Sequence, residues 1–330
     1  MEGKIVTLSI GGGGKQTSGF IKDIILKYFD NDILNNLGDA SHVETSTNTA
    51  FTTDSFVIRP EFFNGGNIGK LSVCGTVNDL SVSGAEPLYI SFALVVAEGY
   101  SYEKLEKIVK SAAEEAKKAG VKIVCGDTKV VERGGIDGVI INTSGIGRVV
   151  KNLNDFGAIE AGDKVIVTSD IARHGMAVML ERGQFGFAGN IASDCACLNK
   201  MMQAVYPFNV KFGRDATRGG IAAVLNEIAE KSGKGFLIKE EDIPLRPDVA
   251  ELCDTLGFDP LSVANEGAAV IICSSEDSQK VLDMLQSTSE GERAAIIGTV
   301  TDENKVILDT YSGGRRHIDL PPGELLPRIC

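Results

Sequence analysis

An amphipathic helix followed directly by a short apolar strand is the feature that most constrains the fold. Residues 101–120 read SYEKLEKIVKSAAEEAKKAG, with Ser101 placed to cap a helix and Gly120 placed to end it. The apolar positions recur at helical spacing, at Leu105, Ile108, Val109, Ala112 and Ala116. Residues 121–125 then predict a buried strand that opens into a Gly-Asp-Thr loop. Helix and strand in direct succession favour an α/β or α+β layered fold.

The same alternation continues to the end of the chain. Residues 162–170 and 266–273 predict further strands, and residues 294–300 and 305–310 predict the last two. A loop containing GRDATRGG leads into a helix that Gly233 ends. A length of 330 residues suggests about two domains, and we place the boundary near residue 155.

The C-terminus differs from the rest of the chain. Residues 320–330 read LPPGELLPRIC, and three prolines and a glycine disfavour a helix or a central strand. We therefore expect an extended arm with Cys330 at its tip. The alternative is that Cys330 is an exposed thiol without a function.

Composition excludes several classes of protein. The net charge of −12 argues against nucleic-acid binding as the main role. The longest apolar stretch, residues 87–97, is too short to span a bilayer, and the first residues lack signal-peptide architecture, so we expect a cytoplasmic protein without membrane contact. Seven cysteines without a C-x-x-C pair fit a reducing compartment. The C-x-C at Cys195 and Cys197 has no partner ligands nearby in sequence, which favours buried or helical thiols over a metal site.

A glycine run near the N-terminus, in LSIGGGGKQTSG, resembles a phosphate-binding loop but fails its pattern. With Gly14 and Lys15 aligned to the G-K pair, Ser9 stands where the first glycine belongs and Gln16 where the Ser or Thr belongs. A glycine run can still present backbone N–H groups to an anion, so we predict contacts with phosphates or with the tail that do not require Lys15. The alternative is a mobile N-terminal loop.

Four acidic residues follow predicted strands or precede predicted helices: Asp54, Asp79, Asp127 and Asp215. Magnesium prefers oxygen ligands and is usually held by one or two carboxylates together with substrate phosphates. Aspartates that converge on one crevice could therefore bring a metal and a triphosphate together. The alternative is that each is a cap or a turn residue, where aspartate is common.

Three further residues have types suited to catalysis. Lys129 could hold a phosphate, or it could be a solvated strand lysine. Glu266 precedes a very apolar strand, where burial would raise its pKa toward that of a usable base, although it could be a turn residue. His174 lacks neighbouring ligands and is interpreted as structural.

Five segments together resemble the hydrogenase maturation factor HypE family, which is related to aminoimidazole ribonucleotide synthetase and selenophosphate synthetase. They are residues 52–94, 126–147, 213–229, 264–268 and the terminal LPRIC. The resemblance implies a two-domain PurM-like fold with an N-terminal ATP-binding and dimerisation domain at 1–155, a C-terminal α/β domain at 156–314, and a mobile tail at 315–330. The family commonly has a histidine before its glycine loop, where this chain has Ile10.

The resemblance also implies a reaction. The carbamoyltransferase HypF places a carbamoyl group on Cys330, ATP phosphorylates the carboxamide oxygen, and loss of phosphate and a proton leaves a thiocyanate. That group supplies the cyanide ligand of [NiFe]-hydrogenase through the HypC–HypD complex. The resemblance assigns catalysis to Cys330, Glu266 and Lys129 and metal binding to Asp54, Asp79 and Asp215. It assigns nucleotide binding to these three aspartates and to Asn78, Asp127, Thr128, Gly12 and Gly13.

Two rival readings stay open. One is another ATP-dependent member of the superfamily, such as selenophosphate synthetase or thiamine monophosphate kinase, although the first cysteine here is Cys74, inside the predicted body. The other is a scaffold whose tail is only a docking peptide.

Overall fold

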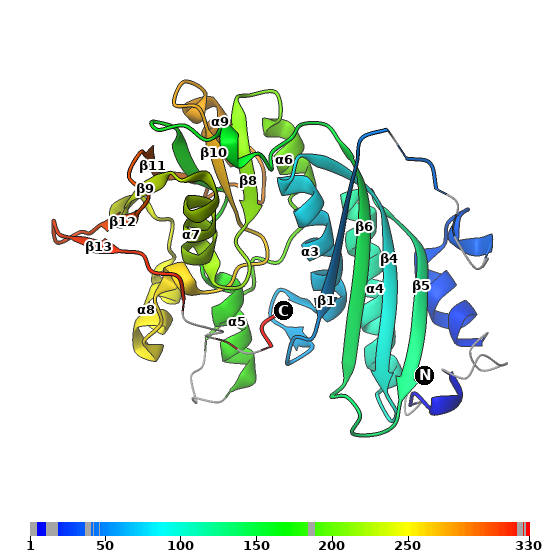
Figure 1. Cartoon of the computed structure of the whole chain (residues 1–330). Helices are drawn as coiled ribbons and strands as arrows, with labels where there is room; N and C mark the ends of the chain where they lie inside the picture. Colours follow the sequence, from blue (N-terminus) through cyan, green and yellow to red (C-terminus); the bar gives the residue numbers. More distant parts are fainter. Residues whose placement is uncertain are drawn as a thin grey trace.

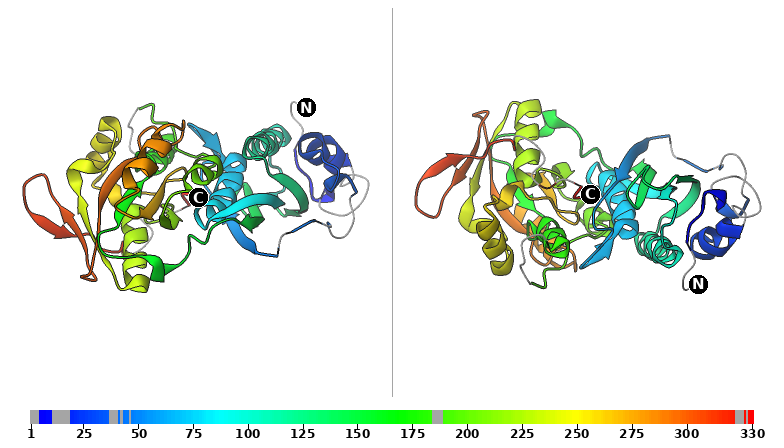
Figure 2. Two further views of the ribbon diagram at one scale, coloured as in Figure 1. Left: turned by 90° about the horizontal axis from the view of Figure 1, so that it is seen from above. Right: turned by 90° about the horizontal axis from the view of Figure 1, so that it is seen from below.

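The computed structural model describes residues 5–10, 19–36, 41, 43–45, 47–183, 189–321, 326 and 328–330. These residues form two halves that lie side by side, each built around one large sheet (Figure 1). Views from above and below show an elongated molecule with the C-terminus between the halves (Figure 2).

The first half is a four-stranded sheet with two helices on one face. The strand order is β1 (Thr49–Phe56), β6 (Val139–Val149), β4 (Ala85–Ala97) and β5 (Lys122–Val131). Only the β4–β5 pair is parallel. Helices α3 (Ile68–Val82) and α4 (Tyr102–Ala119) pack against the sheet. A small hairpin, β2 (Phe62–Phe63) with β3 (Gly66–Asn67), and the short segments η1 (Leu8–Ile10), η2 (Ile21–Leu26), α2 (Lys27–Phe29) and η3 (Leu34–Asn36) complete it.

The second half is a seven-stranded sheet flanked by helices. Its strand order is β13 (Arg315–His317), β12 (Val306–Asp309), β9 (Gly235–Lys239), β11 (Ala295–Thr301), β7 (Lys164–Val167), β10 (Ala269–Cys273) and β8 (Val210–Asp215). The helices are α5 (Arg173–Arg182), α6 (Asn199–Val205), α7 (Gly220–Ser232), α8 (Pro247–Leu256) and α9 (Ser278–Gln286). Short 3₁₀ turns lie at η4 (Phe156–Ala158), η5 (Glu240–Asp242) and η6 (Pro260–Ser262).

The helix predicted over residues 101–120 is confirmed as α4. Ser101 accepts a hydrogen bond from the Lys104 N–H at 3.3 Å, and Gly120 ends the helix with φ of 79°. The predicted apolar stripe is buried against the rest of the first half.

The loop predicted after Cys125 is wrong, because β5 continues through it to Val131. Residues 125–131 pair in parallel with Ser91–Ala97 of β4, a partner that no local pattern reveals. Gly126 is extended rather than turned, and a Cβ on it would lie 2.2 Å from the Phe92 carbonyl oxygen. Glycine is needed here for close backbone approach.

The prediction that residues 305–310 form the last strand is also wrong. β13 follows it and pairs with β12, so the first three residues of the predicted tail belong to the sheet. Among the described helices, none combines the length and apolarity needed to cross a bilayer.

Candidate active site

Three of the predicted acidic residues converge between the two halves. Asp54 lies on β1, Asp79 lies in the last turn of α3, and Asp215 is the last residue of β8. The sequence suggested that these residues follow strands or precede helices, but all three lie within a strand or a helix. Asp79 accepts a hydrogen bond from the Thr52 hydroxyl at 2.7 Å. Asp79 and Asp215 line a cavity of about 240 Å³ together with Thr52 and Arg214.

Burial and mutual repulsion shift the acidity of this carboxylate cluster. Burial first, and then the Asp79 charge, raise the pKa of Asp54 to about 6. Burial followed by the charges of Asp79 and Asp54 raises the pKa of Asp215 to about 7. Burial also raises the pKa of Asp79, while Arg214 opposes the shift. Three half-buried carboxylates that repel one another favour a bound cation.

The donor chemistry of the cluster fits magnesium, since all three side chains offer hard oxygen ligands. The carboxylate oxygens of the three aspartates do not all lie within 4.8 Å of one another, a statement that concerns the described residues. A magnesium ion held by them would therefore keep water or phosphate ligands, as it does in most nucleotide sites.

Glu266 lies at the same end of the second sheet. Ala269 pairs with Asp215, so the strand register of β10 and β8 brings Glu266 close to that aspartate. The Glu266 side chain is 3% exposed, and its Oε1 atom has no hydrogen-bond partner among the described residues. Burial, followed by the neighbouring Cys195, Asp194, Asp215 and Asp54, raises the pKa of Glu266 well above its usual range. A buried carboxylate oxygen without a partner is available to a substrate.

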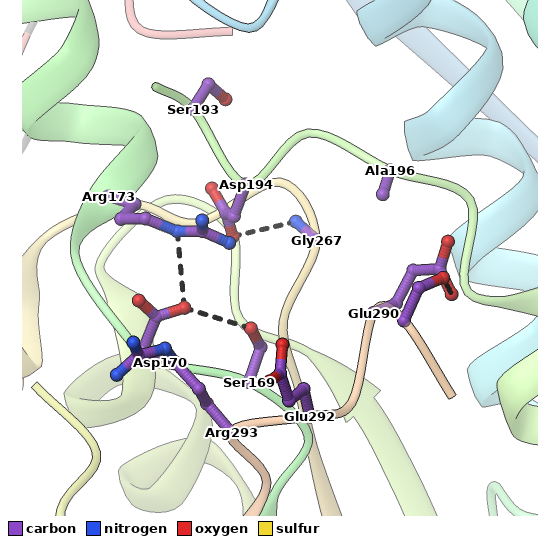
Figure 3. A pocket seen from close by; sticks show the side chains of 11 residues that line it. Ser169, Asp170, Arg173, Ser193, Asp194, Ala196, Gly267, Glu290, Glu292 and Arg293 are labelled. Atoms are coloured by element: carbon purple, nitrogen blue, oxygen red, sulfur yellow. Dashed lines mark hydrogen bonds and ion pairs between the residues drawn. The ribbon is translucent and has the colours of Figure 1, made fainter. Parts of the chain in front are cut away.

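Segment 193–198, which precedes α6, holds the backbone of Glu266. Asp194 accepts hydrogen bonds from the N–H groups of Glu266 at 3.1 Å and Gly267 at 2.9 Å. Figure 3 shows Asp194 reaching Gly267 beside Arg173, on the wall of a second cavity of about 210 Å³. No local pattern in the sequence points to Asp194, because the groups that it binds lie in remote parts of the chain.

Asn78, predicted to bind nucleotide, is buried and already bonded at both ends of its amide. Its Nδ2 donates to the carbonyls of Ala196 at 3.0 Å and Glu266 at 3.4 Å, and its Oδ1 accepts from the Leu198 N–H at 2.8 Å. This structure therefore uses Asn78 to join α3 to segment 193–198, and nucleotide contact stays a prediction.

The last residues of the chain lie along residues 57–59, directly beyond β1. The Val57 N–H donates to the Cys330 carbonyl and the Arg59 N–H donates to the Arg328 carbonyl, both at 3.1 Å. The Arg328 Nε donates back to the Val57 carbonyl at 2.9 Å. Ile329 is buried and Cys330 is half-buried, so the predicted arm is docked in this structure.

Two side chains of α5 clamp the docked tail. Arg182 donates to the carbonyls of Arg59 and Arg328, each at 2.9 Å. His174 lies 2.8 Å from the Ile329 carbonyl through Nε2 and 2.8 Å from the Ser193 hydroxyl through Nδ1. Burial lowers the pKa of His174 to about 4, so the ring is neutral, and because a carbonyl only accepts, Nε2 carries the proton. His174 is structural, as predicted, but the structure it supports is the tail.

Asp127, Thr128 and Lys129 lie away from the carboxylate cluster, on the opposite edge strand of the first sheet. β5 is three strand spacings from β1, about 14 Å at ~4.8 Å per spacing. Asp127 and Lys129 are exposed and pair with each other at 2.8 Å. Within a single chain Lys129 therefore does not reach Asp54, because the strand order places the two residues at opposite edges of the first sheet. Gly12, Gly13 and Lys15 lie outside the described residues.

Comparisons with known proteins decide the family. Residues 37–149 match the model for the AIR synthase related protein, N-terminal domain, and residues 160–310 match the model for its C-terminal domain. The carbamoyl dehydratase HypE of Rhodobacter capsulatus is 42% identical, with 98% of each chain covered. The chain belongs to the HypE family. HypE of Escherichia coli K12 is 41% identical over 98% of this chain and 99% of its own.

Solved HypE structures share the whole architecture. A hydrogenase maturation protein HypE in complex with ATP superposes with a TM-score of 0.94 at 38% identity, covering 98% of this chain and 99% of its own. HypE from a HypE–HypF complex gives a TM-score of 0.81 at 43% identity, covering 92% and 99%. Thiamine-monophosphate kinase from Stenotrophomonas maltophilia, at 17% identity and a TM-score of 0.69, shares the fold alone. The HypE resemblance and the PurM-like α/β fold inferred from the sequence are confirmed.

Proposed function

We propose that the chain is an ATP-dependent carbamoyl dehydratase that converts an S-carbamoyl group on Cys330 to a thiocyanate. The docked tail is the observation that carries this proposal. Val57, whose N–H donates to the main-chain oxygen of Cys330, is three residues beyond Asp54, about 10 Å at ~3.3 Å per residue. The modified sulfur would thus enter the crevice that holds the carboxylates and Glu266.

The chemistry asks for a phosphoryl donor and a base. The carboxamide oxygen attacks the γ-phosphorus of ATP, ADP leaves, and one N–H proton is lost, which gives an O-phosphorylated imidate on the sulfur. The second N–H proton then leaves as the C–O bond to phosphate breaks, and the C≡N bond is complete. The products are protein thiocyanate, ADP and phosphate, so one carboxamide oxygen has left as phosphate.

Glu266 is the base that we assign to proton removal from the carboxamide nitrogen. Its raised pKa favours the protonated form in the ligand-free protein. Any cation that offsets the charges of Asp54 and Asp215 lowers that pKa and frees the base. Burial also excludes water, which would otherwise hydrolyse the phosphorylated imidate.

The cavity at Asp79 and Asp215 suits phosphates better than a whole nucleotide, since about 240 Å³ is below the ~300–1,000 Å³ of most ligand pockets. Asp54, Asp79 and Asp215 would hold Mg²⁺, which would neutralise phosphate charge there. The HypE structure solved with ATP supports the choice of nucleotide. Gly12 and Gly13 are proposed as further phosphate contacts.

A homodimer would complete the site. Helices α3 and α4 pack on one face of the first sheet, and Phe51, on the opposite face, is 69% exposed. We propose that two copies join through this sheet and that Asp127, Thr128 and Lys129 of one copy reach the nucleotide of the other. This assigns residues 1–155 to nucleotide binding and dimerisation and residues 156–314 to the second domain. The tail proposed at residues 315–330 begins with strand β13 of the second sheet.

The tail would be loaded by HypF and would deliver cyanide to hydrogenase iron through HypC–HypD. The solved HypE–HypF complex supports the first partner. None of the seven cysteines is in a disulfide, which fits work in the reducing cytoplasm.

Intact-mass measurement tests the reaction. Protein carbamoylated on Cys330 should lose the mass of one water when given Mg-ATP. Glu266→Gln should still bind nucleotide, but its loss of water should be ~10²–10⁴-fold slower, because a general base usually contributes that much to the rate. Glu290→Gln, a change to an acidic residue on the second cavity, is the matched control and should react normally. A carbamoylated parent protein whose mass does not change would overturn the proposal.

A further inference from the structure

The two thiols of the C-x-C motif are not alone in the folded chain. Cys74 of α3 and Glu115 of α4 lie beside Cys197, and the two sulfurs and a carboxylate oxygen are all within 4.8 Å of one another. The Cys74 and Cys197 sulfurs are 3.7 Å apart, although 123 residues separate them in sequence. This group could not be predicted from the sequence because its members come from three separate segments.

The spacing of the donors matches a tetrahedral metal. Two thiolates at a Zn–S distance of about 2.3 Å stand about 3.8 Å apart across a tetrahedral edge. The observed separation of 3.7 Å therefore needs no movement of either sulfur to admit the ion. A disulfide would need the sulfurs to close to about 2.05 Å.

Glu115 adds a carboxylate to the two thiols of the group. Glu115 is buried, and the ion pair that it makes is with Lys118 at 3.5 Å, through a lysine side chain that is itself 72% exposed. A buried carboxylate with a distant, solvated partner is costly. A divalent cation between the carboxylate and two thiolates would offset that cost.

We propose that Cys74, Cys197 and Glu115 form a Zn²⁺ site with water in the fourth position. Binding replaces each thiol proton with a metal–sulfur bond, and the protons are released to solvent. Cys195 is not one of the three proposed ligands, although its thiol contacts that of Cys74.

The proposed ion would fasten α3 and α4 to segment 193–198. Asn78 already joins α3 to this segment, and Asp194 within it holds the N–H groups of Glu266 and Gly267. The site is therefore structural. It would stabilise segment 193–198, which positions the proposed base Glu266, without contacting the substrate.

Cobalt titration of the metal-depleted full-length protein tests the site, because Co²⁺ bound by thiolates gives a charge-transfer absorption that oxygen ligands do not give. We expect one equivalent to produce this band, Zn²⁺ to displace it, and Zn²⁺ to raise the melting temperature. Cys197→Ala should abolish both effects while its metal-free melting temperature stays close to that of the parent. Cys253→Ala, which removes a buried thiol outside the group, should retain both.

Glu115→Gln gives a graded check. It keeps the two thiolates, so the band should remain while the affinity for Zn²⁺ falls by at least ~10-fold, the smallest effect usual for even an outer-shell partner.

Three results would overturn the proposal. The first is a cobalt band that survives Cys197→Ala but is lost in Cys125→Ser, which would place the metal on the exposed thiol. The second is the absence of any thiolate band in the reduced parent protein. The third is a native mass two hydrogens below the reduced one that Cys197→Ala restores, which would show a disulfide instead.

Discussion

Asp215 shows how neighbours set the acidity of a single residue. It ends β8 in a half-buried position near Asp79 and Asp54, so its neutral form is favoured in the folded protein up to about pH 7. The same carboxyl in the unfolded chain has a pKa near 3.8. The cluster thus favours a bound cation, and it lowers the stability of the ligand-free protein.

The stability of the ligand-free protein should therefore carry a signature of Asp215. Because its folded pKa is raised, its contribution is complete below pH ~4 and is lost as the pH rises to ~7. In Asp215→Asn this loss is absent, so the variant should gain stability relative to the parent between these pH values. The upper limit is about 4 kcal/mol at 1.36 kcal/mol per pKa unit, since Asp54 and Asp79 titrate together with it.

Urea unfolding of both proteins at several pH values without magnesium or nucleotide measures this difference. Asp302→Asn, at an exposed site in the second half, is the control and should follow the parent. A difference between Asp215→Asn and the parent that is flat with pH would contradict the coupling.

At the level of elements, helix α5 and residues 57–59 jointly hold the tail in its docked position. Arg182, near the end of α5, donates hydrogen bonds to both strands of this pairing. His174, near its start, contacts the tail between them. The helix thus fixes one face of a short antiparallel pair whose other edge continues into β1.

Loss of Arg182 should loosen the tail. A hydrogen bond to a charged group contributes about 1.5–3 kcal/mol, so Arg182→Ala should raise the undocked fraction ~10–100-fold. The rate of iodoacetamide modification at Cys330, followed on the C-terminal peptide by mass spectrometry, should rise accordingly. Arg315→Ala, an exposed arginine on β13, should leave the rate unchanged. Equal rates in Arg182→Ala and the parent would contradict the clamp.

Local signals predicted some elements and not others. α4 could be predicted because its cap, its stripe and its terminal glycine all lie within residues 101–120. The length of β5 could not, since its outer part is a strand only because β4 pairs with it. Asp54, Asp79 and Asp215 were predicted as a set with Asp127, but strand order in the sheet, which the sequence does not display, sends Asp127 to the opposite edge. Asp194 and Arg182 were missed because their partners are remote.

The whole molecule has two sheets of unequal character. The second sheet carries helices around it, whereas the first keeps one face uncovered by α3 and α4. Thr53, Asn142 and Ser144 bond across strands on that face, and Phe51 projects from it. A face of this kind is suited to a second copy of the chain.

Phe51→Lys should weaken the proposed homodimer. A charge at the centre of a buried sheet interface would lose the apolar contact and require desolvation. We expect sedimentation velocity to show dimers for the parent and mainly monomers for the variant at micromolar concentration. Tyr311→Lys replaces a comparably exposed aromatic side chain of the second half and should leave the dimer intact. An unchanged dimer in Phe51→Lys would move the interface elsewhere.

The docked tail has a consequence for how cargo leaves the enzyme. Val57, Arg59, His174 and Arg182 all bond to main-chain oxygens of the last three residues. None of these oxygens takes part in the modification, whether the Cys330 sulfur is bare, carbamoylated or cyanated. These anchors therefore do not distinguish the empty carrier from the loaded one, and finishing the chemistry does not by itself open them. Release of the tail would then depend on the acceptor protein, which must bind the tail more tightly than this docking site does, because the site binds every form of the tail alike.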